Sequence, residues 1–346
     1  MTREEARANG YELHETKHSM KRRSPWHNYK RKGTYMVTLV VKDRLPLLGE
    51  LVGRADAEAN VSDIPHIKLS PLGEVIMKEE LQKISRYYPQ VEVWKVCVMP
   101  DHIHMIVRVK EDLEEGKHIG LVLAGFKSGC SKAAMRLGVT VPCASVQGNK
   151  TQGGHPGNGG AVIPLFETGY NDKILLHDGQ LDNWKRYLDD NPRRLLMKRN
   201  NPHLFTVLSD MSVAGEKCQI VGNRFLLDIP DKVAVIVHRR YSEEDKARLM
   251  EEWLACGERG GVLVSAAISP AEKAVLREAM NRSYSIILLR ENGFPELYKP
   301  IGESFDACAK GHLLQISPWE YHMEQKTITR QQCLHLNVLA EKIVNI

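Results

Sequence analysis

Two short apolar runs, separated by Met99-Pro100-Asp101, predict a pair of neighbouring strands between residues 91 and 110. The second strand begins with His102, Ile103 and His104. Side chains two positions apart in a strand point to the same face, so the imidazoles share one face and Ile103 enters the core. Two imidazoles close together on a rigid strand are well placed to bind a metal ion. Two ordinary histidines on a half-buried strand are the alternative.

The hydrophobic pattern on either side of this pair predicts further elements of the same domain. A β-branched run at 35–41 predicts an inner strand, and Ser70-Pro71 predicts the start of a helix that Pro89 ends. A second amphipathic helix is expected at about 118–137. The order strand, helix, strand, strand, helix is typical of a split β-α-β arrangement around an antiparallel sheet. We therefore expect an α+β, ferredoxin-like domain with both helices on one face and both histidines on the other.

A third helical segment is expected from about Leu181 to Asp190. Tyr187 and Asn191 are one helical turn apart, so they lie on the same side of this segment. Because a proline disfavours a helical conformation for the residue before it, Pro192 predicts that Asn191 stands at the helix end. A basic run follows, formed by Arg193, Arg194, Lys198 and Arg199.

From about Asn223 onwards, short apolar runs alternate with amphipathic helical segments. Strands are expected at 233–237, 262–264, 285–289 and 313–316, and helices at about 242–256, 270–280, 301–309 and 327–344. Such alternation is typical of a parallel, Rossmann-like sheet. The sequence contains no G-x-G-x-x-G fingerprint, so no dinucleotide site is predicted. We expect a basic arm at 1–32, the α+β domain at 33–205 and a smaller α/β domain at 215–346.

Composition narrows the class of protein. The 346 residues are enough for two domains that each bury a core, and 42% hydrophobic with 26% charged residues is ordinary for a globular protein. No apolar run reaches membrane-spanning length, and the first residues contain no apolar signal core. The seven cysteines are scattered without a C-x-x-C pair, which favours reduced thiols. We therefore predict a cytoplasmic, nucleoid-associated protein that does not bind membranes.

Basic residues crowd the first 32 positions, with Trp26 and Tyr29 among them, in a chain of net charge +5 and pI ≈ 8.7. Basic side chains neutralise phosphates and aromatic rings stack on bases, so the arm is a candidate DNA contact. A solvated arm is the alternative, and a solvated helix face is the alternative for the two lysines of the 118–137 helix. The candidate DNA contacts are Lys21, Arg22, Arg23, Lys30, Arg31, Lys127, Lys132, Arg193 and Arg194.

Six segments occur in an order that matches one known family: GTYMVTLVVKDR, PLGEVIMKE, VMPDHIHMIV, FKSGCSKA, PLFETGYNDKIL and RYLDDNP. On these segments, the chain from about Gly33 to Lys198 resembles the HUH-type, single-tyrosine transposases of the IS200 class, closest to their relatives associated with repetitive extragenic palindromes. Two positions depart from the family. Asp101 stands where the family commonly has Asn, and Asn191 stands where it often has Gln.

The resemblance implies a metal-dependent endonuclease and strand transferase acting on single-stranded DNA that contains a hairpin. It implies that His102, His104 and Asn191 hold Mg²⁺ or Mn²⁺, and that Tyr187 attacks the scissile phosphate to form a 5′-phosphotyrosine. Tyr170, in another shared segment, is the alternative nucleophile. A homodimer is compatible with the resemblance. A catalytically inactive, hairpin-binding regulator and a replication-initiator or relaxase-type HUH nuclease are the alternative functions.

The C-terminal part weakly resembles the Rossmann-like domain of DNA processing protein A, a family that binds single-stranded DNA. The matching segments are GNRFLLDIPDKVAVI, VLVSAAISPAEKAVLREA and LLQISPW. His238-Arg239-Arg240 replaces the glycine-bearing turn that this family has after its first strand. A scaffold for dimerisation or for positioning DNA is therefore the alternative for this domain.

Overall fold

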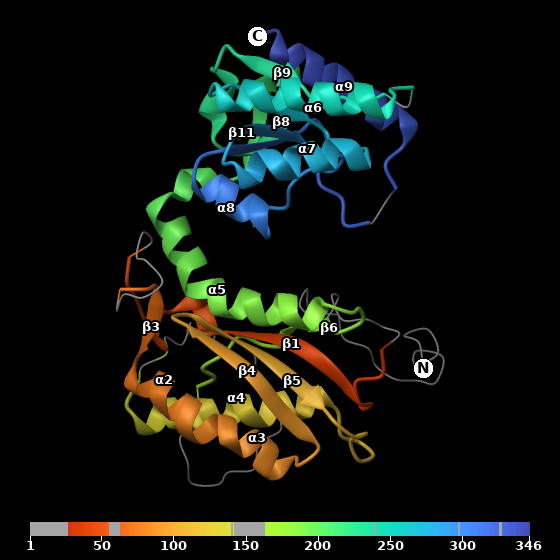
Figure 1. Ribbon diagram of the computed structural model, residues 1–346. Helices are drawn as coiled ribbons and strands as arrows, with labels where there is room; N and C mark the ends of the chain where they lie inside the picture. Colours follow the sequence, from red (N-terminus) through yellow and green to blue (C-terminus); the bar gives the residue numbers. More distant parts are fainter. Residues whose placement is uncertain are drawn as a thin grey trace. The chain divides into compact units, whose positions relative to one another are not determined.

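The computed structural model describes residues 27–54, 63–139, 141, 163–238, 240–296, 298–324 and 327–346. The chain divides into two compact units between Leu196 and Met197, and each is described by itself (Figure 1). The sequence pattern placed the end of the first domain later, at residue 205. Within the described ranges, every helix is too short or too polar to cross a lipid bilayer.

The first unit is built on a four-stranded antiparallel sheet in the order β4-β5-β1-β6. The strands are β1 (Gly33–Val40), β4 (Val91–Met99), β5 (His102–Val109) and β6 (Asn171–Ile174). The predicted pair of strands on either side of Pro100-Asp101 is thus confirmed. In the β1–β5 ladder, Thr38 lies opposite His104 and Val40 lies opposite His102. A separate two-stranded ladder joins β2 (Gly49–Val52) to β3 (His66–Leu69), and a short 3-10 turn, η1 (Lys42–Arg44), follows β1.

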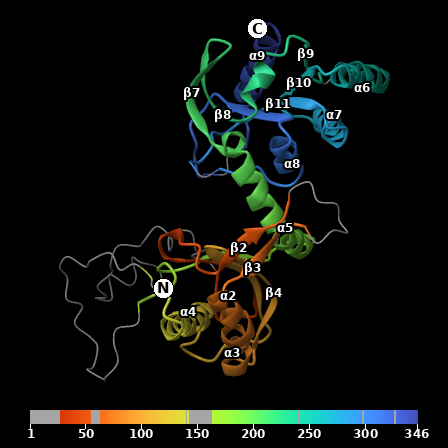
Figure 2. The same ribbon diagram turned by 90° about the vertical axis from the view of Figure 1, so that its left-hand side faces the viewer.

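One face of this sheet is covered by two helical segments (Figures 1 and 2). The first is a continuous run of α2 (Pro71–Val75), a π-helical turn η2 (Ile76–Glu80) and α3 (Leu81–Tyr87). The second is α4 (Ile119–Arg136). The run begins where predicted. The hydroxyl oxygen of Ser70 accepts a hydrogen bond from the Gly73 N–H, and the missing N–H of Pro71 costs nothing because N–H groups of the first turn have no partner within the helix. The buried core between helices and sheet includes Ile103, as the alternation of β5 requires.

The opposite face is covered by α5 (Gln180–Asn200), which packs Trp184 and Leu188 against Met36 and Ile106 of the sheet. The expectation that this helix ends at Asn191 is wrong, because the helix continues through Pro192. A proline inside a helix removes one backbone hydrogen bond and costs about 3 kcal/mol. The apolar residues of α5 that pack on the sheet, Leu181, Trp184 and Leu188, stabilise the helix and offset this cost.

The second unit has a six-stranded sheet in the order β7-β8-β12-β11-β10-β9. Strands β9 (Lys232–Ala234), β10 (Val262–Ser265), β11 (Ser285–Leu289) and β12 (Leu313–Ser317) are parallel, and β8 (Glu216–Gly222) runs antiparallel to β12. Strand β7 (Leu208–Val213) pairs with β8 in a hairpin that the sequence pattern did not predict. Two 3-10 turns, η3 (Pro202–Phe205) and η4 (Arg224–Leu227), flank these two strands.

The helices of the second unit lie on both faces of its sheet (Figure 2). Helices α6 (Glu243–Glu258), α7 (Pro270–Asn281) and α8 (Glu303–Ala309) pack in one core cluster, and α9 (Arg330–Val344) packs in the other. Helices α6, α7 and α8 each connect two successive parallel strands, as the predicted alternation requires, and α9 follows the last strand, β12.

Candidate active site

His102 and His104 project from the face of the first sheet that α5 covers. Their ring centroids are 4.7 Å apart at an interplanar angle of 83°, and the two Nε2 atoms are 3.1 Å apart. His104 is buried and His102 is half-buried at the first position of β5. The strand period therefore brings the imidazoles together on one face, as the sequence predicts.

The Nδ1 atom of each imidazole has its own partner. The ring N–H of His102 donates to Asp101 Oδ1 at 2.6 Å, and Thr38 Oγ1 lies 2.8 Å from His104 Nδ1. A partner on Nδ1 fixes ring orientation and turns the Nε2 lone pair toward a ligand, as in metal sites where a carboxylate supports a histidine. Sequence analysis named Asp101 only as a departure from the family, and it missed Thr38. The signal for Asp101 was its position beside His102, whereas Thr38 depends on the register of β1 and β5.

A second basic group fixes Asp101. Arg44 donates to Asp101 Oδ2 at 3.1 Å, so the carboxylate bridges a guanidinium and an imidazole. Burial alone would raise the pKa of this carboxyl, but the hydrogen bonds from His102 and Arg44 outweigh burial and lower its pKa to about 2. Asp101 is therefore ionised throughout the neutral range and serves as a stable acceptor for the His102 ring.

The spacing of the two Nε2 atoms fits an octahedral divalent cation. Two ligand nitrogens at about 2.1 Å from an octahedral ion, about 90° apart, stand about 3 Å from each other, and the observed Nε2 separation is 3.1 Å. Among the described residues no three His, Cys, Asp or Glu side chains converge, so a third ligand from these residues has to be of another type.

Asn191 is a side chain of another suitable type. It lies on the buried stripe of α5 with Trp184 and Leu188 and is 8% exposed. Its Nδ2 has no hydrogen-bond partner within the part of the chain that the structure describes. The two ends of an amide are interchangeable by rotation, so its carbonyl oxygen can take that position. A buried polar atom without a partner requires an explanation, and a bound cation would provide one.

Tyr187 lies beside the imidazole pair. Its ring centroid is 5.6 Å from that of His104, and the Arg194 guanidinium carbon lies 5.8 Å from the Tyr187 ring centroid. The residue is 36% exposed, so the ring can be reached by a large substrate. Tyr170 is different, because it belongs to the core cluster on the α4 side of the sheet and is 8% exposed. The structure therefore brings Tyr187, and not Tyr170, to the histidines.

The predicted DNA contacts divide between the two faces of the first unit. Arg194 and Arg193 are on α5, where Arg193 pairs with Asp190 at 2.5 Å. Lys127 and Lys132 are on α4, on the other side of the sheet. Lys127 Nζ donates to the carbonyl oxygens of Glu167 and Gly169, and burial lowers its pKa. These bonds give Lys127 a structural role, and its contact with DNA stays a prediction.

Lys30 and Arg31 precede β1, at the end of the sheet where Gly33 pairs with Val109. The histidines lie at the other end of the same ladder, opposite Val40 and Thr38. The remaining basic candidates of the arm, Lys21, Arg22 and Arg23, lie outside the described residues.

In the second unit, a buried carboxylate binds the backbone of the turns that follow β9 and β10. Glu272, which is 3% exposed, accepts hydrogen bonds from the backbone N–H groups of Val237, Ile268 and Ser269 at 2.7–2.9 Å. Backbone amides after a strand and before a helix commonly bind phosphate. Here the amides beyond β9 and β10 already bind an internal anion.

Comparisons with known proteins find weak likenesses. No protein-family model matches the chain. An uncharacterized protein of Haemophilus influenzae is 25% identical over 88 residues, which is 25% of this chain and 42% of that protein, so the chain spans less than half of the relative.

Among solved structures, a REP-associated tyrosine transposase bound to a REP hairpin has a TM-score of 0.30 at 14% identity, covering 49% of this chain and 72% of that one. DNA processing protein A from Helicobacter pylori has a TM-score of 0.30 at 20% identity, covering 40% and 65%. A transposase-like protein of Deinococcus radiodurans has a TM-score of 0.25 at 12% identity, covering 49% and 95%. At these scores the likenesses do not say what the chain does.

Proposed function

We propose that the first unit is an HUH-type nuclease that cleaves and rejoins single-stranded DNA beside a hairpin through a covalent tyrosyl intermediate. The observation that carries this proposal is the pair of imidazoles with Nε2 atoms 3.1 Å apart and the Tyr187 ring 5.6 Å from one of them. The order of the six sequence segments supports the same function independently. The second unit is proposed to be a Rossmann-like accessory domain.

In this mechanism His102, His104 and Asn191 would hold the divalent cation. When bound, Mg²⁺ or Mn²⁺ would polarise the scissile phosphate and offset its developing negative charge. Asp101 and Thr38 keep the two rings in place through Nδ1. The preorganised rings therefore need no rearrangement when DNA arrives.

Tyr187 supplies the nucleophile. Its phenolic oxygen gives up its proton and forms a bond to phosphorus, the bond from phosphorus to the 3′ oxygen breaks, and the released 3′ oxygen takes up a proton, so that no net proton is gained or lost. The product is a 5′-phosphotyrosine that preserves the phosphodiester energy, so a second 3′-hydroxyl can reverse the step and join new strands. The Arg194 guanidinium, close to the Tyr187 ring, is placed to contact the phosphate as charge builds up.

The test is formation of a covalent adduct. The full chain is incubated with end-labelled single-stranded DNA containing a hairpin, with Mn²⁺ or with chelator, and analysed by denaturing electrophoresis. We expect an adduct with Mn²⁺ only, and none with Tyr187→Phe, because that change removes the nucleophilic oxygen and keeps the ring. Tyr170→Phe is the matched control and should still form the adduct. An adduct on Tyr187→Phe but not on Tyr170→Phe would mean that the nucleophile is misassigned.

A further inference from the structure

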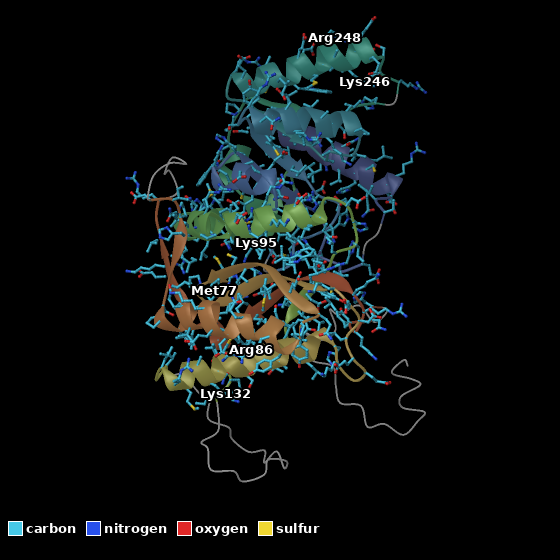
Figure 3. The ribbon with its side chains drawn as sticks, turned by 60° about the horizontal axis from the view of Figure 1, so that its bottom comes forward. Met77, Arg86, Lys95, Lys132, Lys246 and Arg248 are labelled. Carbon is cyan, nitrogen blue, oxygen red and sulfur yellow. The ribbon has the colours of Figure 1, made fainter. Side chains whose placement is uncertain are left out.

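A second candidate site lies in the first unit, on the helical layer rather than on the histidine face. A cavity of about 520 Å³ opens between the η2–α3 segment and α4. Both helices pack on the sheet face that receives Ile103, so the sheet separates the cavity from His102 and His104. A volume of a few hundred Å³ is the size of a small-ligand pocket. Figure 3 shows Arg86 on α3 and Lys132 on α4 at this layer.

The inner wall of the cavity contains a buried carboxylate. Glu80, the last residue of the π-helical turn, is 4% exposed. Its Oε1 accepts a hydrogen bond from Lys83 at 2.6 Å, while Oε2 has no hydrogen-bond partner among the described residues. Because Glu80 lines the cavity, Oε2 can accept a hydrogen bond from a ligand with an N–H donor. Single π-helical turns also recur at functional sites.

Two glycines of α4 shape the space beside this carboxylate. Gly129 faces Glu80, where a Cβ would overlap Oε2. Gly125, one turn earlier, also lines the cavity and has no described heavy atom within 4 Å of the position of a Cβ. Gly129 therefore leaves room for the carboxylate itself, whereas a side chain at Gly125 would occupy the cavity.

The rim of the cavity combines a flat aromatic surface with cations. Tyr87 is 70% exposed at the edge of the cavity, and Lys117, which pairs with Glu114 at 2.6 Å, has its Nζ 5.8 Å from the Tyr88 ring centroid. Lys132 is exposed on α4 and has no ion-pair or hydrogen-bond partner in the described part of the chain. Exposed aromatic rings beside lysines are the combination that holds a base by stacking and its phosphate by charge.

We propose that this groove binds a guanine nucleotide unit, with the base stacked on Tyr87, its Watson–Crick edge on Glu80 and its phosphate at Lys117 and Lys132. Guanine presents two adjacent donors, N1–H and the N2 amino group, to a carboxylate. Adenine, cytosine and thymine each place an acceptor at that edge, which the carboxylate repels. The unit is an unpaired residue of single-stranded DNA or a free nucleotide. The inference rests on the proposed function only if the ligand is single-stranded DNA. Binding of a free nucleotide does not depend on that function, because the groove contains none of the cleavage residues.

The test measures binding without cleavage. Fluorescence anisotropy of the full chain, in chelator, compares labelled oligo-dT with the same oligonucleotide carrying one central dG, and dGMP serves as a competitor. Gly125→Leu fills the groove with a better helix former, so it should fold at least as well as the parent protein. Glu80→Gln removes the charge. Glu79→Gln, at the exposed neighbour that pairs with Arg136, is the matched control.

We expect the parent protein and Glu79→Gln to bind the dG oligonucleotide at least fivefold more tightly than oligo-dT. Gly125→Leu and Glu80→Gln should lose this preference, while adduct formation at Tyr187 is retained on a hairpin substrate. Competition by dGMP that is lost in Gly125→Leu would support the site with free nucleotide as its ligand. An absence of dG preference and of dGMP binding in the parent protein would overturn the inference. So would a preference that persists in folded Gly125→Leu. Neither result would affect the adduct assay.

Discussion

Replacing Asp101 should weaken metal binding while leaving the first unit folded. Its carboxylate accepts the His102 ring N–H at 2.6 Å and the Arg44 guanidinium at 3.1 Å. Without this acceptor the His102 ring can rotate or protonate on Nε2, and either change removes a ligand lone pair from the pair of imidazoles. The loss therefore falls on binding of the cation and not on the larger hydrophobic core, which lies on the other face.

The magnitude follows from the bond and its exposure. A hydrogen bond to a charged group contributes about 1.5–3 kcal/mol, and exposure to solvent favours the lower end. The Asp101 side chain is 23% exposed, so a loss of about 1.5–2 kcal/mol, or about 10–30-fold in metal affinity, is expected for Asp101→Ala. Asp101→Asn keeps an acceptor for the ring N–H and loses only the charge, so it should cost about threefold.

The assay is Mn²⁺ titration followed by electron paramagnetic resonance, with thermal unfolding measured in parallel. Arg44→Ala is the control, because the Arg44 side chain is 62% exposed and touches only the outer oxygen of Asp101, so its effect should be smaller than that of Asp101→Ala. Equal Mn²⁺ affinity for the parent protein and a folded Asp101→Ala would refute a supporting role for this carboxylate. A larger effect of Arg44→Ala than of Asp101→Ala would show that Arg44 does not act on the metal site through the Asp101 carboxylate.

Two further predictions concern stability. Gly129→Ala should destabilise the first unit by about 1–3 kcal/mol in urea unfolding, because its Cβ would overlap Glu80 Oε2; Gly125→Ala, which meets open space, should be neutral or stabilising, and equal stability of the two variants would contradict the overlap. Burial raises the pKa of Tyr35 in the folded protein to about 12. The contribution of Tyr35 to the free energy of unfolding is therefore complete below the pKa of the unfolded chain, about 10, and is lost as pH rises toward 12. In Tyr35→Phe, the midpoint of urea unfolding should no longer fall between about pH 10 and pH 12. If the midpoint still falls with pH as steeply as in the parent protein, Tyr35 does not cause the loss of stability.

Much of the first unit follows from local pattern. The period of two in β5 places His102 and His104 together, and the helical spacing before Tyr88 and after His118 predicts two helices on one face. The Thr38 contact does not follow, because it depends on strand register, and a slip of one residue would move every side chain of β1 to the other face. Register is a property of two segments far apart in the chain, which a local pattern does not contain.

Helix α5 shows a second limit of local pattern. Pro192 is a strong helix-ending signal because it lacks a donor and restricts the residue before it. The helix continues, because packing of Trp184 and Leu188 on the sheet holds the segment in place, and such tertiary contacts are not visible in a local window. The hairpin of β7 and β8 was missed for a related reason: Leu208 to Val213 carries polar residues and a bulge, and the strand is stabilised by pairing with β8.

The choice between the two candidate tyrosines also depends on tertiary structure that a local sequence pattern does not contain. Tyr170 and Tyr187 both lie in segments shared with the resembled family, so sequence alone left both open as the nucleophile. The sheet separates them: Tyr170 is in the core with α4, and Tyr187 is on α5 beside His104. A nucleophile has to reach a phosphate that contacts the imidazole pair, and a hydroxyl in the opposite core cannot do so without unfolding that core. The face on which each tyrosine lies therefore favours Tyr187 over Tyr170 as the nucleophile of the proposed mechanism.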